Sequence, residues 1–286
     1  MISALNRLSD GTIELTITIP WKRVAGEYQK SLAKLGVDIT IKGFRKGKAP
    51  IKKVEEYLGK SKIYEEILKT LIAAVYIEAL KEHNLKPIIN PQITVISLQE
   101  NKDWQIKATT CELPKVDLGD YQEALRKVLA SEKIWTPAKD KTKPPLDQKD
   151  ESVRLEKIFQ SLLTTTKVQI PEILIQDEIN RMLSRLIDQT GRLGLTVEQY
   201  LASIGKTSEQ IRTEYYQQAQ DSLKLELILA AIADEQKIET SEEEVQKLIQ
   251  AVPDEETKKS LDNQAQKAYI RQLLRKRKVI DNLSKL

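Results

Sequence analysis

Apolar and polar residues alternate in three stretches near the start of the chain, at residues 12–19, 93–98 and 104–109. The first of these stretches carries isoleucine or leucine at every odd position from 13 to 19. Such alternation predicts β-strands that bury one face. Residues 101–103 separate the last two stretches and fit the turn of a hairpin.

Longer stretches between the first and second predicted strands follow the helical period instead. Apolar residues recur every three or four positions over Trp21–Leu35 and from about Lys62 to Asn84, and a short helix is expected from Pro50 to Leu58. Val37–Ile41 is expected to be extended. Together these elements predict an α+β N-terminal domain at residues 1–114, an antiparallel sheet with helices on it.

The second half of the chain follows the helical period throughout, which predicts an elongated all-α C-terminal domain at residues 151–286. Thr196-Val197-Glu198-Gln199 and Thr207-Ser208-Glu209-Gln210 fit capping boxes, and Thr240-Ser241-Glu242-Glu243 is expected to cap a further helix. One last helix is expected from Pro253 to Leu286. In the helix expected to start at Pro171, the side chains predicted to face inward are Ile175, Ile179, Met182, Leu183, Leu186 and Ile187.

The stretch between the two domains has a different composition. One helix is expected at Tyr121–Lys133, and residues 136–145 are polar, charged and rich in proline, which is typical of a linker. We therefore expect a linker at residues 115–150. Trp135 stands alone in this stretch and is expected to pack the linker.

Charge and composition exclude several classes of function. Up to Leu113 the chain has 18 Lys and Arg residues against 13 Asp and Glu, whereas the remainder has 28 against 29, so any anionic partner is expected at the first domain. The single Cys111 permits no intramolecular disulfide, and the single His83 lies in no catalytic or metal-binding pattern. No phosphate-binding glycine motif, signal peptide or membrane span is recognisable. We expect no cofactor, no nucleotide and no membrane, and a soluble, cytoplasmic protein.

A basic loop in the first domain carries the most specific signal. Six Lys and Arg residues and no acidic residue lie between Ile41 and Val54. Gly43 and Gly47 allow a shaped turn, Pro50 suits the start of a helix, and Phe44 is expected at the tip. One interpretation is a solvated basic loop. The other is a binding site, because an aromatic ring among cations suits an anionic surface with an apolar spot, such as ribosomal RNA beside ribosomal protein.

The octapeptide Gly43-Phe44-Arg45-Lys46-Gly47-Lys48-Ala49-Pro50 resembles the ribosome-binding signature of the trigger factor family, and Glu65-Glu66-Ile67-Leu68 also looks like that family. The resemblance implies an ATP-independent chaperone that docks at the ribosomal exit tunnel and shields nascent chains. Its implied partners are a ribosomal protein, ribosomal RNA and unfolded nascent polypeptides, and it implies a monomer or weak homodimer. The ribosome-binding residues that it implies are Gly43, Phe44, Arg45, Lys46, Gly47, Lys48 and Pro50.

The linker departs from the family pattern. Most members insert an FKBP-like prolyl isomerase domain there, but residues 115–150 are too short and too polar for one, so we expect no isomerase and no other enzyme activity. The alternative function is an RNA-binding ribosome assembly factor that uses the same loop. A second basic cluster, from Arg271 to Lys278, is interpreted as a solvated helix face rather than as a nucleic-acid contact.

Overall fold

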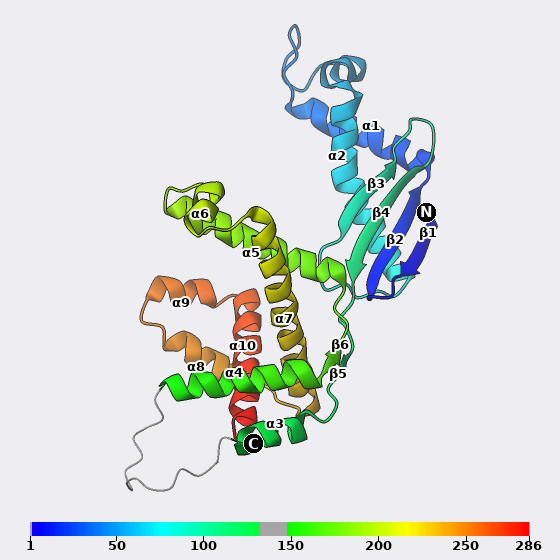
Figure 1. The fold of residues 1–286 in the computed structure, drawn as a ribbon. Helices are drawn as coiled ribbons and strands as arrows, with labels where there is room; N and C mark the ends of the chain where they lie inside the picture. Colours follow the sequence, from blue (N-terminus) through cyan, green and yellow to red (C-terminus); the bar gives the residue numbers. More distant parts are fainter. Residues whose placement is uncertain (1, 132–147, 286) are drawn as a thin grey trace, which may run out of the picture. The chain divides into compact units, whose positions relative to one another are not determined.

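The computed structural model describes residues 2–131 and 148–285. It divides into two compact units, each with its own core (Figure 1). The N-terminal unit is Met1–Leu113 together with Pro171–Leu174, and the helical unit is Pro114–Ile170 together with Ile175–Leu286. The fold class, an α+β part followed by a mostly helical part, is as predicted.

The N-terminal unit contains a four-stranded antiparallel sheet in the order β1-β2-β4-β3. β2 (Thr12–Ile19) and the hairpin of β3 (Gln92–Ser97) and β4 (Trp104–Cys111) confirm the alternating pattern. β1 (Ile2–Arg7) was not predicted. It is an edge strand that buries no residue fully. Its sequence therefore shows little alternation of apolar and polar residues, the pattern by which the other strands were predicted.

Two helices cover the apolar face of this sheet, α1 (Trp21–Asp38) and α2 (Ile51–Glu82). α2 changes direction at Gly59, where φ is +73°, close to the predicted break between a short and a long helix. The expectation that Val37–Ile41 is extended was wrong in part, because α1 continues to Asp38. The core between sheet and helices includes the odd-numbered residues of β2, which are at most 1% exposed.

The helical unit is built from eight helices and one short strand pair within its described residues. The strands are β5 (Val116–Asp117) and β6 (Lys167–Val168). The helices are α3 (Tyr121–Ser131), α4 (Gln148–Thr165), α5 (Glu172–Arg192), α6 (Val197–Ser203), α7 (Ser208–Glu235), α8 (Glu242–Gln250), α9 (Glu255–Leu261) and α10 (Gln264–Leu283). The first turn of α5 belongs to the N-terminal unit.

Side-chain caps determine where these helices begin. Reciprocal capping boxes start α6 at Thr196, α7 at Thr207 and α8 at Ser241, so all three predicted caps are present. The prediction of a single last helix from Pro253 to Leu286 was wrong for this segment of the chain. It is divided into α9 and α10, because Asn263 adopts an extended conformation and accepts a hydrogen bond from the Gln266 backbone N–H at 2.8 Å, which starts a new helix.

Within the described residues, the helical unit has a principal core and several smaller ones. α3, α4, α7 and α10 share the principal core, to which α3 contributes Tyr121, Leu125 and Leu129. Of the side chains predicted to face inward on α5, Ile175, Ile179 and Leu186 are buried, but Ile187 is 56% exposed. That part of the prediction was wrong because the apolar stripe of α5 is narrower than its sequence indicates. No helix in the described parts of the chain is long and apolar enough to cross a membrane.

Candidate functional site

The basic loop of residues 39–50 connects α1 to α2. Hydrogen bonds from Phe44 N to Ile41 O, at 2.9 Å, and from Lys48 N to Arg45 O, also at 2.9 Å, form two successive turns. Pro50 ends the loop with φ of −58°, and its carbonyl accepts from Lys53 N and Val54 N at the start of α2. The loop is therefore a shaped structure with its own backbone hydrogen bonds.

Both glycines of the loop have backbone conformations that disfavour other residues. φ is +94° at Gly43 and +74° at Gly47. At Gly47 space is restricted as well, because a Cβ atom would lie 2.9 Å from the Val37 carbonyl oxygen. Gly47 N also donates to Ile39 O at 3.3 Å, which closes the base of the loop on the end of α1.

Apolar side chains anchor the base of the loop to the core. Ile39, Ile41 and Ala49 are partly buried against the core of the N-terminal unit. Tyr28 in the middle of α1 donates a hydrogen bond to Glu55 Oε1 near the start of α2 at 2.7 Å, and its burial together with this bond raises the pKa of Tyr28. Hydrogen bonding and packing thus join α1 to α2, the two helices that the loop connects.

The tip of the loop is exposed, and its cations have no ion-pair partner in the part of the chain that the structure describes. Phe44 is 39% exposed, and Arg45, Lys46 and Lys48 are exposed beside it. None of these three cations forms an ion pair with any residue that the structure describes. Elsewhere in the N-terminal unit, by contrast, Lys and Arg side chains often pair with carboxylates, as in Arg23 with Glu78 at 2.7 Å. The loop therefore offers cations that can pair with a partner without losing an internal contact.

Three further exposed residues belong to this surface but were not among the predicted site residues. Lys42 lies directly before Gly43, and Val37 and Ile51 lie at the base of the loop, where they are 62% and 53% exposed. A signal for Val37 and Ile51 was present in the sequence, because both are apolar residues at helix ends and neither belongs to the apolar stripe of its helix. They add apolar area beside the cations.

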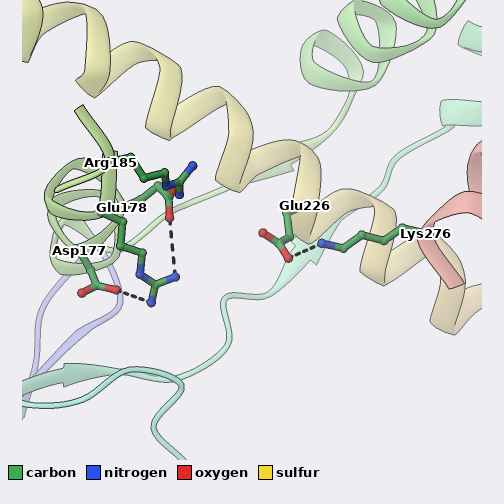
Figure 2. Close-up of polar contacts among 6 residues, drawn as sticks. Asp177, Glu178, Arg185, Glu226 and Lys276 are labelled. Carbon is green, nitrogen blue, oxygen red and sulfur yellow. Dashed lines mark hydrogen bonds and ion pairs between the residues drawn. The ribbon is translucent and has the colours of Figure 1, made fainter. Parts of the chain in front are cut away.

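The second basic cluster, on α10, has a different environment. Arg271 pairs with Glu242, Arg275 with Asp234, Lys276 with Glu226 and Lys278 with Glu244; only Arg277 of this cluster pairs with no described residue. Figure 2 shows the pair of Lys276 with Glu226, which joins α10 to α7. These cations bind helices of their own unit together.

A similar use of charge occurs on α5. Arg181 pairs with Asp177 at 2.7 Å, and Arg185 pairs with Glu178 at 3.0 Å (Figure 2). Both acidic residues are one or two turns before their partners on the same helix. These charges solvate and stabilise the exposed face of α5.

The helical unit also exposes large apolar side chains on several of its helices and the turns between them. Near the end of α5 and around α6 these are Ile187, Leu193, Leu195 and Ile204, and on α8 and α10 they are Leu248, Tyr269 and Leu273. They are the positions at which an apolar partner could contact this unit, although single exposed apolar residues are common on protein surfaces.

The described residues contain no group of three or more His, Cys, Asp or Glu side chains arranged to hold a metal ion. Cys111 is buried, as expected for a structural thiol. His83 Nε2 lies 2.9 Å from Ser3 Oγ, which in turn donates to Glu82 Oε2 at 2.7 Å. These contacts join β1 to the end of α2.

Comparison with known proteins covers both units. The family model "Bacterial trigger factor protein (TF)" matches residues 1–139, and the model "Bacterial trigger factor protein (TF) C-terminus" matches residues 139–285. The two matches adjoin at residue 139. A solved structure titled "Promiscuous Substrate Recognition in Folding and Assembly Activities of the Trigger Factor Chaperone" has a similar fold, with a TM-score of 0.69 and 17% identity over 100% of this chain and 99% of that one.

Curated relatives match over a shorter stretch. A trigger factor of Clostridium tetani (strain Massachusetts / E88) is 31% identical over 137 residues, which is 48% of this chain and 31% of the relative. A trigger factor of Caldanaerobacter subterraneus subsp. tengcongensis is 33% identical over 122 residues, which is 43% of this chain and 28% of the relative. The aligned part of the chain thus spans about a third of the length of these relatives.

Proposed function

The chain belongs to the bacterial trigger factor family, and from this premise we propose that it is an ATP-independent chaperone that docks on the ribosome and shields nascent polypeptides. The observation that carries the proposal is the basic loop. It presents Phe44, Arg45, Lys46 and Lys48 on a shaped turn, exposed and without ion pairs to the described residues. Gly43, Gly47 and Pro50 set the conformation of that turn.

The chemistry of the loop supports a ribosomal partner. Unpaired cations gain most from phosphate groups or from carboxylates, because no internal ion pair has to be broken first. The ring of Phe44 adds an apolar or stacking contact at the tip. We infer that ribosomal RNA and a ribosomal protein at the exit tunnel share this loop between them.

The helical unit supplies the surface for clients in this proposal. Its exposed apolar side chains, such as Leu193 and Tyr269, are dispersed among charged residues. Weak, distributed apolar contacts suit a protein that must bind many sequences and release them. Clients are thus unfolded segments, bound without ATP.

We further propose three properties that follow from membership of this family. The domains are a ribosome-binding domain at 1–114 and a client-binding domain at 151–286, with a linker at 115–150 whose helix α3 packs into the core of the helical unit. The protein acts in the cytoplasm as a monomer or weak homodimer. It has no prolyl isomerase activity, a proposal supported by the two family models, which adjoin at residue 139 without a domain between them.

Co-sedimentation with ribosomes tests the proposal. The variant Phe44→Ala/Arg45→Ala/Lys46→Ala removes the ring and two cations, yet keeps the glycines and the proline. A ring or a paired arginine at the centre of a contact is worth roughly 2 kcal/mol, and two such losses imply that ribosome affinity falls on the order of a hundredfold to a thousandfold. Circular dichroism is expected to be unchanged, because the three side chains are exposed.

A matched control is Lys62→Ala/Lys81→Ala, which also removes two positive charges. Both lysines are exposed on α2 and form no ion pair with a described residue. This variant should bind ribosomes like the wild type. Both variants should still suppress aggregation of a denatured client. If the loop variant pellets with ribosomes as well as the wild type does, the loop is not the anchor; if the wild type suppresses no aggregation, the protein is not a chaperone.

A further inference from the structure

A groove of about 450 Å³ lies in the N-terminal unit, outside the basic loop. Ile72, Ala73 and Ile77 of α2 line one side of it, and Asn90 and Pro91, which lead into β3, line the other. A volume of this size is within the range of sites that bind small ligands or peptide side chains. Ile77 is 51% exposed at the rim, so the groove leaves apolar surface in contact with water.

The strand beside this groove has a free edge. Among the described strands β3 pairs only with β4, and it carries neither a charged residue nor a proline, which are two of the usual protections of an edge strand. Its register with β4 is regular from Gln92 to Val95 and shifts only after Val95. The regular part directly follows the Asn90–Pro91 side of the groove. An extended peptide could therefore pair with β3 through its backbone while its side chains enter the groove.

Charge selects among such peptides. Lys69 is the one charged residue that lines the groove, and it forms no ion pair with any described residue, although Glu65 lies one turn before it on α2. No carboxylate lines the groove to oppose an anion. A peptide that places an acidic side chain beside its apolar residues would complement this lining.

We propose that this groove, together with the free edge of β3, binds an extended apolar polypeptide segment that carries a carboxylate beside its apolar residues. The proposal rests on the proposed function, because it assigns a second contact surface, on the ribosome-docking unit itself, to the same unfolded clients.

Photo-crosslinking with the full chain tests the proposal. Two synthetic peptides of about ten residues share one apolar stretch with a photoreactive leucine, and they end in two aspartates or in two lysines. Mass spectrometry then locates the crosslinks. We expect the aspartate peptide to label the α2 segment from Leu68 to Ile77 and the Asn90–Pro91 segment on the order of threefold more than the lysine peptide does, and Lys69→Glu to reverse that preference.

Ala73→Glu places a charge in the groove and is expected to reduce labelling there on the order of fivefold. Ala74→Glu is the matched control, because Ala74 is exposed on the same helix but does not line the groove, and it should leave labelling unchanged. Both variants should pellet with ribosomes like the wild type.

The outcomes separate this proposal from the proposed function. Crosslinks confined to the helical unit would overturn the groove and leave the chaperone function standing. An equal loss of peptide labelling in Ala73→Glu and Ala74→Glu would also overturn the groove. Crosslinks nowhere on the chain would overturn both. Sedimentation velocity tests whether a second copy of the chain occupies the groove instead. If the wild type dimerises with rising concentration, Ala73→Glu abolishes this dimerisation and no peptide labels the groove, a second copy occupies the groove and the peptide proposal is overturned.

Discussion

The basic loop and the basic cluster of α10 contain similar residues but use them in opposite ways. In the loop, Arg45, Lys46 and Lys48 are exposed on a glycine-shaped turn and pair with no described residue. On α10, Arg275 and Lys276 pair with Asp234 and Glu226 of α7. The number of charges does not distinguish the two regions; the presence of acidic partners does.

The difference has a thermodynamic reason. A cation that already pairs within the protein must give up that contact before it can bind a phosphate, so its gain from an external partner is small. An unpaired cation gives up only water. We therefore expect the α10 cluster to bind phosphate groups poorly although it is dense in charge, and the loop to bind them more readily.

Of the effects that compare these two basic regions, the largest expected one is that of salt on ribosome binding. If Lys42, Arg45, Lys46 and Lys48 each neutralise one phosphate, raising the salt from about 50 to 200 mM should weaken binding by up to roughly 150-fold. The control is the triple alanine variant of the loop, whose residual binding should depend less on salt. Equal salt dependence in both proteins would contradict the contrast between the two clusters. Titration of labelled ribosomes at several salt concentrations measures the salt dependence of both proteins.

A smaller effect is expected from the shape of the loop alone. Gly47→Ala keeps every charge, but its Cβ would meet the Val37 carbonyl oxygen at 2.9 Å in a conformation with positive φ. The loop has to shift, and ribosome affinity should fall about tenfold, since misplaced contacts lose roughly 1.4 kcal/mol.

Gly26→Ala is the control for this substitution, because Gly26 lies inside α1 with nothing within 4 Å of its added Cβ. It should bind ribosomes normally and melt at a slightly higher temperature, as a helical alanine is favoured over glycine. If Gly47→Ala binds as tightly as Gly26→Ala, charge alone, and not the turn, makes the site.

The smallest effect concerns the α10 pairs and depends on pH. The hydrogen bond from Lys278, followed by that from the Ser241 backbone, lowers the pKa of Glu244 below its ordinary value. A lowered folded-state pKa stabilises the fold above the unfolded-state pKa, and this stabilisation is lost as the pH falls through the folded-state value. Lys278→Met should therefore lower Tm on the order of 1 °C at neutral pH, and the difference from wild type should shrink on acidification below about pH 4.

Arg277→Met is the matched control on the same helix, because Arg277 pairs with no described residue. It should leave Tm unchanged at either pH, and neither variant should alter ribosome binding. Calorimetric melting at neutral and acidic pH measures the difference. A constant difference between Lys278→Met and wild type at all pH values would show that the ion pair is not its cause.

Local signals in the sequence determined much of this protein. The alternation in residues 12–19, the capping boxes at Thr196 and Thr207 and the turn of the basic loop each depend on residues within a few positions of one another. Backbone sterics and side-chain caps act over that distance, so the sequence by itself specifies these elements. The resemblance of the loop to one family was readable for the same reason.

The tertiary structure alone decided which residues are left for partners. Nothing local indicates that Arg275 meets Asp234, 41 positions earlier, or that Ile187 stays exposed while Leu186 is buried. The same holds for β4, which lies between β2 and β3, and for the groove beside the free edge of β3. Pairing and burial depend on which distant segments pack together, and the packing is a property of the whole chain that no short pattern contains. The unpaired cations of the loop are defined only by the absence of such partners among the residues described.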